Sequence, residues 1–588
     1  MKKILIILFL FASLLASAEP LSVKDVKKDY SYLWTVLMQV DTQVWYIATA
    51  ANGGSDTGGD GSITEPWLTL KHACDTITGA AFVGDTISIG AGTFDETAQV
   101  VWDEEVSLIG VIASPLTTTI TSSSALSPII LGSSATEGTA GNQSISYIAF
   151  DGNLTAVKLV YIIGRSNVSV HHCTFLDALE SGISFQGRTT AGNGPPTTYS
   201  IGNSFHDNTL TNCAIFSSGW GRGELHISGQ QTMTVLDNNF DQTDRAAGSN
   251  GYCMKFDKEG YNKDVLVDGN TFLRAYEGEA YNINCEFWNS QGGIEVSNNT
   301  FWNACLDIAG NPVGSEKGSY AYSFYVHNNN FRTTATNNNE INGVIIEGNA
   351  SDVIVTQNYF EGLTSCLSMT LRQPTLAMNN IRIHHNVFNN YGWYNVDYGA
   401  AINCGTDQAD AIFSNIYILN NTFYDDGVGF DPRHIVWILT HDGTFTNWVL
   451  KNNILLNTKV AFFQTQLQTG GSGTFNSLTL SNNIAYGNAN SNNPSFDAGL
   501  TPITLVNTGQ ITSDPLFRST TDFHLQAGSP AIDAGLDVSA TTGGLDFHGA
   551  SRYGATYDIG AFEWGAGRLL KIGTVLPTID YKVVLIDH

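Results

Sequence analysis

The sequence predicts an all-β solenoid of stacked coils, because one short phrase recurs along the chain. The phrase reads apolar-x-apolar-x-Asn-x-Phe, and successive copies end 28 to 35 residues apart. No helical stripe of apolar residues lies between copies, and a repeat of this length is typical of stacked β-structure. About fourteen coils at roughly 4.8 Å each predict a rod of about 65–70 Å. The residues that end the copies are Phe175, Phe205, Phe240, Phe272, Phe301, Phe331, Phe360, Phe388, Phe423, Ile454 and Ile484.

Each coil is expected to hold three short strands separated by turns. The Val, Ile and Leu of the phrase alternate, so they point inward, and the closing Phe residues stack inside the coil. The Asn precedes a turn, tolerates the left-handed conformation and can hydrogen-bond the neighbouring coil. We therefore expect an asparagine ladder formed by Asn238, Asn270, Asn299, Asn329, Asn358, Asn386 and Asn421.

The N-terminal segment reads as an export signal followed by a cap. Residues 1–18 have a charged start, an apolar run and the small-residue site Ala16-Ser17-Ala18, which is typical of a cleaved secretory signal. Residues 19–43 are expected to form a capping segment with a helix over 21–38. A second short helix is expected over Pro66–Ile77, with Thr64 as its cap. A cap is needed because an open solenoid end exposes core and unpaired strand edges.

The rest of the chain divides by its pattern. Residues 44–500 are assigned to the solenoid, 501–564 to a module that closes its last coils, and 565–588 to a tail. No further apolar stretch is long enough to span a membrane. The mature chain is therefore expected outside the cell, secreted or at the cell surface. A monomer is expected, although no pattern in the sequence determines the oligomeric state.

Charge and cysteine content narrow the classes of partner. The chain has 27 basic and 54 acidic residues and a formal net charge of −27, which argues against nucleic acid and anionic membranes. An anionic polysaccharide would need a locally basic cleft or bridging cations. The eight cysteines include no CxxC pair. Cys253 and Cys285 are expected to stack on adjacent coils, where buried free thiols are favoured over a disulfide.

Both ends of the solenoid resemble known sequences. The opening WYIATAANGGSDTGGDGSITEPWLTLKHACDTI and GDTISIGAGTF are similar to the first coils of exported right-handed parallel β-helix proteins of the pectate-lyase-like superfamily. The ending SDPLF, FHLQAGSPAIDAG and DIGAFE resembles that of bacterial surface β-helix proteins of the choice-of-anchor type. The resemblance covers residues 44–564. It implies a right-handed parallel β-helix and export, but one fold of this kind serves many reactions.

The densest charged stretch, Asp241–Glu286, is the first place to look for a site. Five basic residues lie between Arg245 and Arg274, among many carboxylates. The segment Gly251–Asp257 (GYCMKFD) resembles the one that carries the catalytic Lys of some alginate and chondroitin lyases, which implies Lys255 as the base that removes a proton next to a uronate carboxylate. Those families place an Arg on the following coil, where this chain has Glu286. The candidate catalytic residues are Lys255, Arg274 and Glu286.

Two further groups of residues complete the candidate site. Carboxylates can hold Ca²⁺, which neutralises a uronate, and the candidate ligands are Asp257, Glu259 and Glu279. Aromatic rings can stack on sugar faces, and the candidates are Trp288, Trp393 and Tyr394. The histidines His171, His172, His327, His384 and His385 occupy equivalent positions before the turn, and we expect them to be exposed.

The residues leave two functions open. The first is an enzyme acting on extracellular polysaccharide, a lyase in preference to a glycoside hydrolase, with Ca²⁺ as a candidate cofactor. The second is a non-catalytic surface or matrix protein that binds carbohydrate or mediates adhesion. The enzyme requires Lys255 and nearby carboxylates to converge, whereas the binding protein needs only a broad polar or aromatic face.

Overall fold

The computed structural model describes fifteen stretches of the chain. They are residues 42–188, 198–215, 223–243, 251–256, 261–274, 283–310, 321–333, 341–371, 376–392, 400–406, 410–426, 434–456, 462–487, 493–552 and 556–565. The signal segment, the helix predicted over 21–38 and the tail from 566 onward lie outside these stretches.

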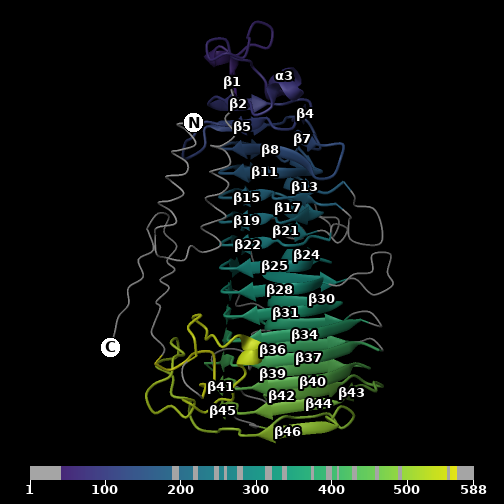
Figure 1. Ribbon diagram of the computed structural model, residues 1–588, viewed down its shortest axis with the longest axis vertical. Helices are drawn as coiled ribbons and strands as arrows, with labels where there is room; N and C mark the ends of the chain where they lie inside the picture. The colour runs from purple at the N-terminus through teal and green to yellow at the C-terminus, as the bar shows by residue number, and fades with distance from the viewer. Residues whose placement is uncertain are drawn as a thin grey trace, which may run out of the picture.

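The chain is a right-handed parallel β-helix, as the sequence predicts. Three long sheets, called A, B and C below, run along the rod, and all of the strand pairs within them are parallel (Figure 1). Each full coil contributes one strand to sheet C, then to A, then to B, and the fourteen strands of sheet B agree with the expected number of coils. No helix in the described stretches is long and apolar enough to cross a membrane.

The strands have the following bounds. Sheet A contains β1 (Val44–Ile47), β2 (Thr86–Ile89), β5 (Ser107–Ile109), β8 (Thr139–Ser146), β11 (Arg165–His171), β15 (Ser204–His206), β19 (Thr234–Leu236), β22 (Leu266–Asp268), β25 (Gln291–Ser297), β28 (Ala321–His327), β31 (Ala350–Thr356), β34 (Ala377–His384), β37 (Ile412–Leu419), β40 (Thr444–Lys451), β43 (Thr474–Phe475), β44 (Ser477–Ser481) and β46 (Thr504–Thr508). Sheet B contains β3 (Gly92–Asp95), β6 (Thr118–Thr121), β9 (Ala149–Asp151), β12 (Thr174–Leu176), β16 (Thr209–Thr211), β20 (Asn239–Gln242), β23 (Thr271–Arg274), β26 (Thr300–Trp302), β29 (Asn330–Arg332), β32 (Tyr359–Glu361), β35 (Val387–Asn389), β38 (Thr422–Tyr424), β41 (Ile454–Leu456) and β45 (Ile484–Tyr486). Sheet C contains β4 (Val100–Val101), β7 (Ile130–Ser133), β10 (Lys158–Ile163), β13 (Ser181–Gln186), β17 (Gly223–Ser228), β21 (Tyr252–Phe256), β24 (Ile283–Trp288), β27 (Cys305–Gly310), β30 (Asn342–Gly348), β33 (Ser365–Leu371), β36 (Ala400–Thr406), β39 (His434–Thr440) and β42 (Phe463–Leu467). A separate pair is formed by β14 (Ser200–Ile201) and β18 (Gln230–Gln231).

A short helix, α3 (Leu70–Thr76), packs at the first coils and confirms the second predicted helix. Its cap is Thr69, whose hydroxyl accepts a hydrogen bond from the backbone N–H of His72, and not Thr64 as predicted. The helix begins later than predicted because Trp67 first pairs with Ile47 in extended conformation. The carboxylate of Glu96 accepts from the N–H of Leu70, which satisfies another free donor of the first turn.

An asparagine ladder fixes the corner between sheets A and B. In each pair, the backbone N–H and the side-chain Nδ2 of one Asn donate to Oδ1 of the Asn one coil on, at 2.8–3.0 Å and 2.9–3.1 Å. The ladder contains all seven predicted residues and extends them at both ends. Its members are Asn208, Asn238, Asn270, Asn299, Asn329, Asn358, Asn386, Asn421, Asn453 and Asn483.

The left-handed position at this corner is the residue before the ladder Asn, which corrects the prediction. Asn298 and Asn328, for example, have φ of 54° and 55°, and Gly269 occupies the same place with φ 72°. The ladder Asn is therefore free to use its whole amide in hydrogen bonds between coils. The turn is made by its neighbour, which is usually Asn, Asp or Gly.

The closing Phe residues stack along the interior, as predicted. From Phe240 to Phe423, neighbouring rings are nearly parallel with centroids 4.5–5.0 Å apart. Phe205 is an exception, because it lies on β15 in sheet A opposite Val170. The residue that pairs with Phe175 and Phe240 in sheet B is Leu210, so the phrase of that coil is HDNTL and not YSIGNSF.

All eight cysteines are free and buried, which agrees with the free thiols favoured for Cys253 and Cys285. The expected pairing of two of them is wrong by one residue, since Cys285 lies opposite Met254 and not opposite Cys253. The cause is the connection after sheet B, which is one residue shorter in the coil of Cys285 than in that of Cys253.

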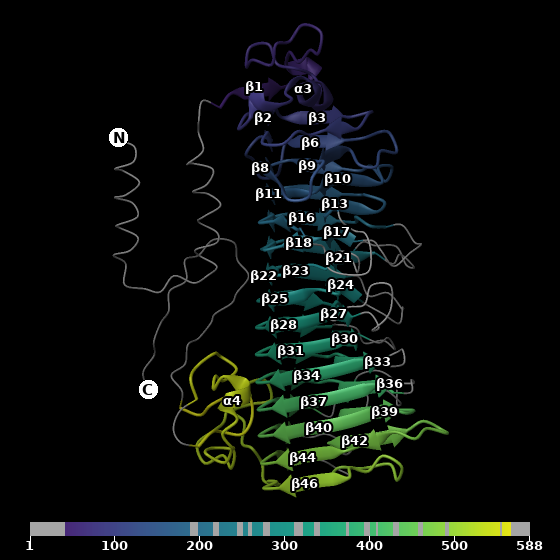
Figure 2. The ribbon, with the colours of Figure 1, turned by 45° about the vertical axis from the view of Figure 1, so that its right-hand side comes forward.

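Residues 510–552 and 556–565 fold back along the outside of the last coils (Figures 1 and 2). They include the short helix α4 (Ser539–Thr542). The left-handed corner residues hold this segment: Asn452 Nδ2 donates to the carbonyl of Leu536 at 2.8 Å, and Asn482 Nδ2 to that of Ala534 at 2.9 Å. Within the segment, Arg552 pairs with Glu563 at 3.0 Å. The segment therefore protects the corner between sheets A and B.

Two corner histidines are buried beside this segment, which corrects the expectation that they are exposed. His384 Nδ1 lies 2.9 Å from the hydroxyl of Thr356 and 3.0 Å from Nδ1 of His385. Burial, helped by the charges of Arg382 and Arg552, lowers the pKa of His384 to about 3. Burial also lowers the pKa of His385 well below its usual value. Both rings are therefore neutral in the folded chain.

Replacing a ladder residue should destabilise the rod. Asn329→Ala removes the acceptor for two donors of Asn299 and the two donors of Asn329 itself, all buried. Because each buried group left without a partner costs about 1–3 kcal/mol, we expect the free energy of unfolding to fall by about 3 kcal/mol in urea denaturation.

The matched control for this change is Asn330→Ala, one residue away. The Asn330 side chain is partly exposed and accepts one hydrogen bond, from Nε of Arg332. Its loss should change stability by less than about 1 kcal/mol. Equal losses in the two variants would contradict a structural role of the ladder.

The buried histidines should make the fold sensitive to mild acid. The folded pKa of His384 is below its unfolded value near 6.5, so its stabilising effect is present above about pH 6.5 and is lost as the pH falls. Between pH 7 and 5 the wild type should therefore lose about 2 kcal/mol more of its unfolding free energy than His384→Asn.

The control for this comparison is the interval from pH 7 to pH 8. There the imidazole is neutral in both states, so the wild type and the variant should change stability in parallel. A variant as sensitive to acid as the wild type would show that His384 does not carry the effect.

Candidate functional site

Charged side chains of both signs occupy one row on sheet C. Lys255 on β21 pairs in register with Glu286 on β24, and Glu286 pairs with Asp307 on β27. The preceding strand, β17, places His226 opposite Lys255. Adjacent strands lie about 4.8 Å apart, so parallel pairing brings together four residues that are separated by 21 to 31 positions in the sequence.

Lys255 and Glu286 form the centre of this row. Their Nζ and Oε2 atoms make an ion pair, and each residue is only 3% exposed. The Lys255 ammonium lies 4.4 Å from the centroid of the Tyr252 ring and 5.9 Å from that of Trp288. Aromatic faces favour a cation at these distances. The structure thus brings together Lys255, Glu286 and Trp288, which the sequence nominated.

Two further charges lie beside this pair. Arg274, the remaining candidate catalytic residue, ends β23 on sheet B and is buried. The pKa of the Tyr252 hydroxyl is raised, mainly by burial and then by the charge of Asp307, while Arg274 acts in the opposite direction. Asp307 and Arg274 are therefore within electrostatic reach of the ring that contacts Lys255.

The sequence did not nominate His226 or Asp307. His226 is linked through Gln186, whose Nε2 lies 3.0 Å from Nδ1 of His226, and Gln186 in turn accepts from Tyr161. These residues have no shared motif, and the coil lengths around them differ. Only the pairing of β17, β21, β24 and β27 shows that they lie in one row.

Five nominated residues lie outside the described stretches. They are the candidate Ca²⁺ ligands Asp257, Glu259 and Glu279, and the candidate sugar-stacking residues Trp393 and Tyr394. Among the residues that the structure does describe, no group of three His, Cys, Asp or Glu side chains is arranged to hold a metal ion.

The row on sheet C and the neighbouring Arg274 on sheet B combine positive charges with groups that can transfer a proton. Lys255 and Arg274 can neutralise a carboxylate, and Glu286, Asp307 and His226 can accept or return a proton.

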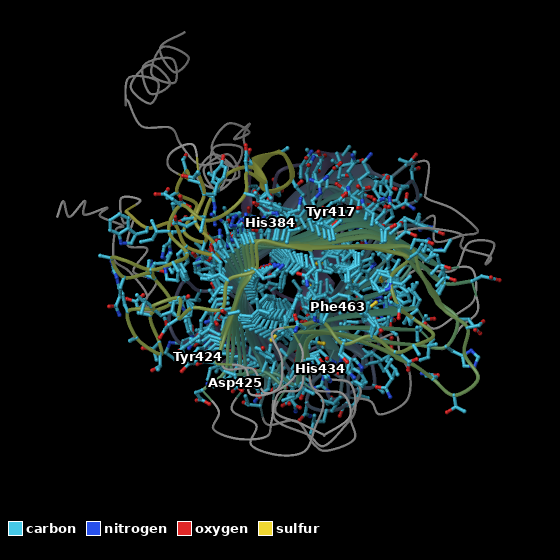
Figure 3. The ribbon with its side chains drawn as sticks, turned by 90° about the horizontal axis from the view of Figure 1, so that it is seen from below. His384, Tyr417, Tyr424, Asp425, His434 and Phe463 are labelled. Atoms are coloured by element: carbon cyan, nitrogen blue, oxygen red, sulfur yellow. The ribbon has the colours of Figure 1, made fainter. Side chains whose placement is uncertain are left out.

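Sheets A and C face different flanks of the rod, with Tyr417 of sheet A and His434 of sheet C on opposite sides of the end view (Figure 3).

Comparison with known proteins gives only distant likenesses. Neither a protein-family model nor a curated protein sequence matches the chain. Among solved structures, the A-module of the mannuronan C-5 epimerase AlgE4 of Azotobacter vinelandii has a TM-score of 0.40 at 11% identity, over 73% of this chain and 98% of that one. A double mutant of the tailspike protein of E. coli bacteriophage HK620 has a TM-score of 0.38 at 13% identity, over 78% and 80%.

A third similar structure is PfbA, a surface adhesin of Streptococcus pneumoniae. Its TM-score is 0.34 at 11% identity, over 69% of this chain and 87% of that one. At these identities and TM-scores, none of the likenesses carries a conclusion about what this chain binds or does.

Proposed function

We propose that this protein acts on an extracellular polysaccharide, and that the reaction takes place at the row on sheet C. The observation that carries the proposal is the enclosed Lys255–Glu286 pair, flanked by two aromatic rings and by the further charges of Arg274 and Asp307. Buried, mutually paired charges of this kind mark a candidate functional site.

The finer proposal is β-elimination on a uronate-containing glycan. Arg274 neutralises the uronate carboxylate, which makes the neighbouring C–H more acidic. The proton of Lys255 passes to Glu286, and the neutral amine then removes the carbon-bound proton. The C–O bond to the leaving sugar breaks, its oxygen takes up the proton held by Glu286, and a carbon–carbon double bond remains. Lys255 is then again an ammonium and Glu286 a carboxylate.

The proton exchange within the pair is chemically reasonable because both partners are buried. Poorly solvated opposite charges can recombine as an amine and a carboxylic acid at less cost than the same pair in water. Ca²⁺ bound by Asp257, Glu259 and Glu279 could assist by neutralising the substrate. Those ligands lie outside the described residues, so no step is assigned to the ion.

The remaining parts of the proposal concern location and assembly. We propose that residues 1–18 are removed on export, and that the mature chain works as a monomer outside the cell. The sequence of the leader supports the export, while the monomeric state is a proposal without a supporting observation of its own. The second candidate function, carbohydrate binding without cleavage, is favoured by the exposed tyrosines of sheet A.

The assay follows the ultraviolet absorbance of the unsaturated product. The mature chain is incubated with alginate, pectate and glycosaminoglycans, with and without Ca²⁺. We expect the absorbance to rise on at least one substrate. In Lys255→Ala the rate of this rise should be at least about 100-fold lower, since positioned acid–base groups contribute about 10²–10⁴-fold to a rate.

A second variant guards against misfolding. Lys255→Ala removes the ion-pair partner of the buried Glu286 carboxylate, whereas Lys255→Met combined with Glu286→Gln replaces both members of the pair by uncharged residues of similar size. The matched control is Lys451→Ala, a partly exposed lysine on sheet A. Release of reducing ends without absorbance would favour hydrolysis, and binding without either product would favour the non-catalytic function.

A further inference from the structure

The outer face of sheet A is hollowed by a bend that repeats from strand to strand. Strands β28, β31 and β34 each contain one residue with a positive φ: Ser323 at 61°, Asp352 at 55° and Asn380 at 56°. Strand β25 contains two at the same place, Gly292 at 87° and Gly293 at 65°. The register passes over these residues, since Tyr322 pairs with Ser351 and Phe324 with Val353. Because the strands bend in phase, a groove of about 290 Å³ runs across them.

One wall of the groove is a row of side chains on four neighbouring strands. Glu295, Tyr325, Ile354 and Arg382 pair in register and all line the groove. The next strand continues the row with Tyr417, which pairs with Arg382. Arg382 therefore has a tyrosine on each side, at one strand spacing from Tyr417 and two from Tyr325.

Arg382 is held so that its terminal nitrogens remain open. Its Nε donates to Oδ1 of Asn380 at 3.0 Å, and Nδ2 of Asn380 donates to Asp352 at 2.5 Å. Arg165, Arg332 and Arg552 each pair with a carboxylate, whereas the terminal guanidinium nitrogens of Arg382 have no partner among the described residues. Although the chain has a net charge of −27, these two nitrogens do not pair with a carboxylate of the described residues. They can therefore bind an anionic group of a ligand.

Both tyrosines are also fixed in place. The Tyr325 ring is 40% exposed and stacks on His327 with centroids 4.0 Å apart, while His327 Nε2 lies 3.3 Å from Glu295. The hydroxyl of Tyr417 accepts from Asn447 at 3.2 Å. Rings held in this way lose little conformational entropy when a ligand covers them.

We propose that this groove binds an anionic glycan. A carboxylate or sulfate group pairs with the guanidinium of Arg382, and sugar rings lie along the rod on the faces of Tyr325 and Tyr417. The groove is a binding site separate from the charged row on sheet C. The inference rests on the proposed function only for the class of ligand, since it requires binding and not cleavage.

The test measures binding by isothermal titration calorimetry to the chain that carries Lys255→Met and Glu286→Gln, in which turnover is disabled. The probes are an oligogalacturonate, its methyl ester and a sulfated oligosaccharide. We expect at least one anionic probe to bind, the methyl ester to bind at least about 10-fold more weakly, and Arg382→Gln to raise Kd by about 10- to 100-fold. A response to the first probe identifies a carboxylate ligand, and a response to the third a sulfate.

Two further variants separate the site from general charge effects. Tyr325→Ala should weaken binding several-fold by removing a stacking face. Arg332→Gln, which removes a partly exposed arginine of sheet B paired with Glu361, should leave binding unchanged. The proposal is overturned if no anionic probe binds, if the oligogalacturonate binds and its ester binds equally well, or if Arg382→Gln binds the responding probe as the parent does. Each outcome is independent of the absorbance assay.

Discussion

The hydrogen bonds between coils at the asparagine corner are the constraint on which the rest of the structure depends. Each ladder Asn from Asn208 to Asn453 donates twice to the next coil and once to a carbonyl of the coil before it, as Asn329 does to Asn358 and to Val296. Three bonds per coil at a buried position leave one register for the turn. A slip by one residue would leave these groups without partners and would turn the adjoining strands inside out.

A corner fixed in this way allows the rest of the coil to vary in length. The connections from sheet B to sheet C and from C to A differ between coils, yet every strand returns to the same parallel register. The consequence is that rows, and not sequence neighbours, define the surfaces of the molecule. Lys255, Glu286 and Asp307 form one such row, and Tyr325, Arg382 and Tyr417 belong to another.

This arrangement explains what the sequence could and could not predict. The repeated phrase is local, so the solenoid, the ladder and the Phe stack follow from it. Lys255 and Glu286 were nominated separately, from the charged stretch and from the resemblance around Lys255, but their pairing was not predicted. Leu210 was missed because two Asn-containing phrases lie five residues apart in one coil. His226, Asp307 and the sheet A groove depend on pairing between coils of unequal length. No periodicity in the sequence encodes that pairing.

The fold does not require the charges of the row on sheet C. The row that holds Lys255, Glu286 and Asp307 continues with Ile345, Ser368, Asn403 and Trp437 on the following strands. Those coils stack with no ion pair at this position, so the β-helix does not require one there. A buried ion pair is often no more stable than apolar residues of similar volume, and stability therefore gives no reason to keep Lys255 and Glu286. The charges are confined to three consecutive coils where two aromatic rings meet them, which is the arrangement expected if the pair is retained for chemistry.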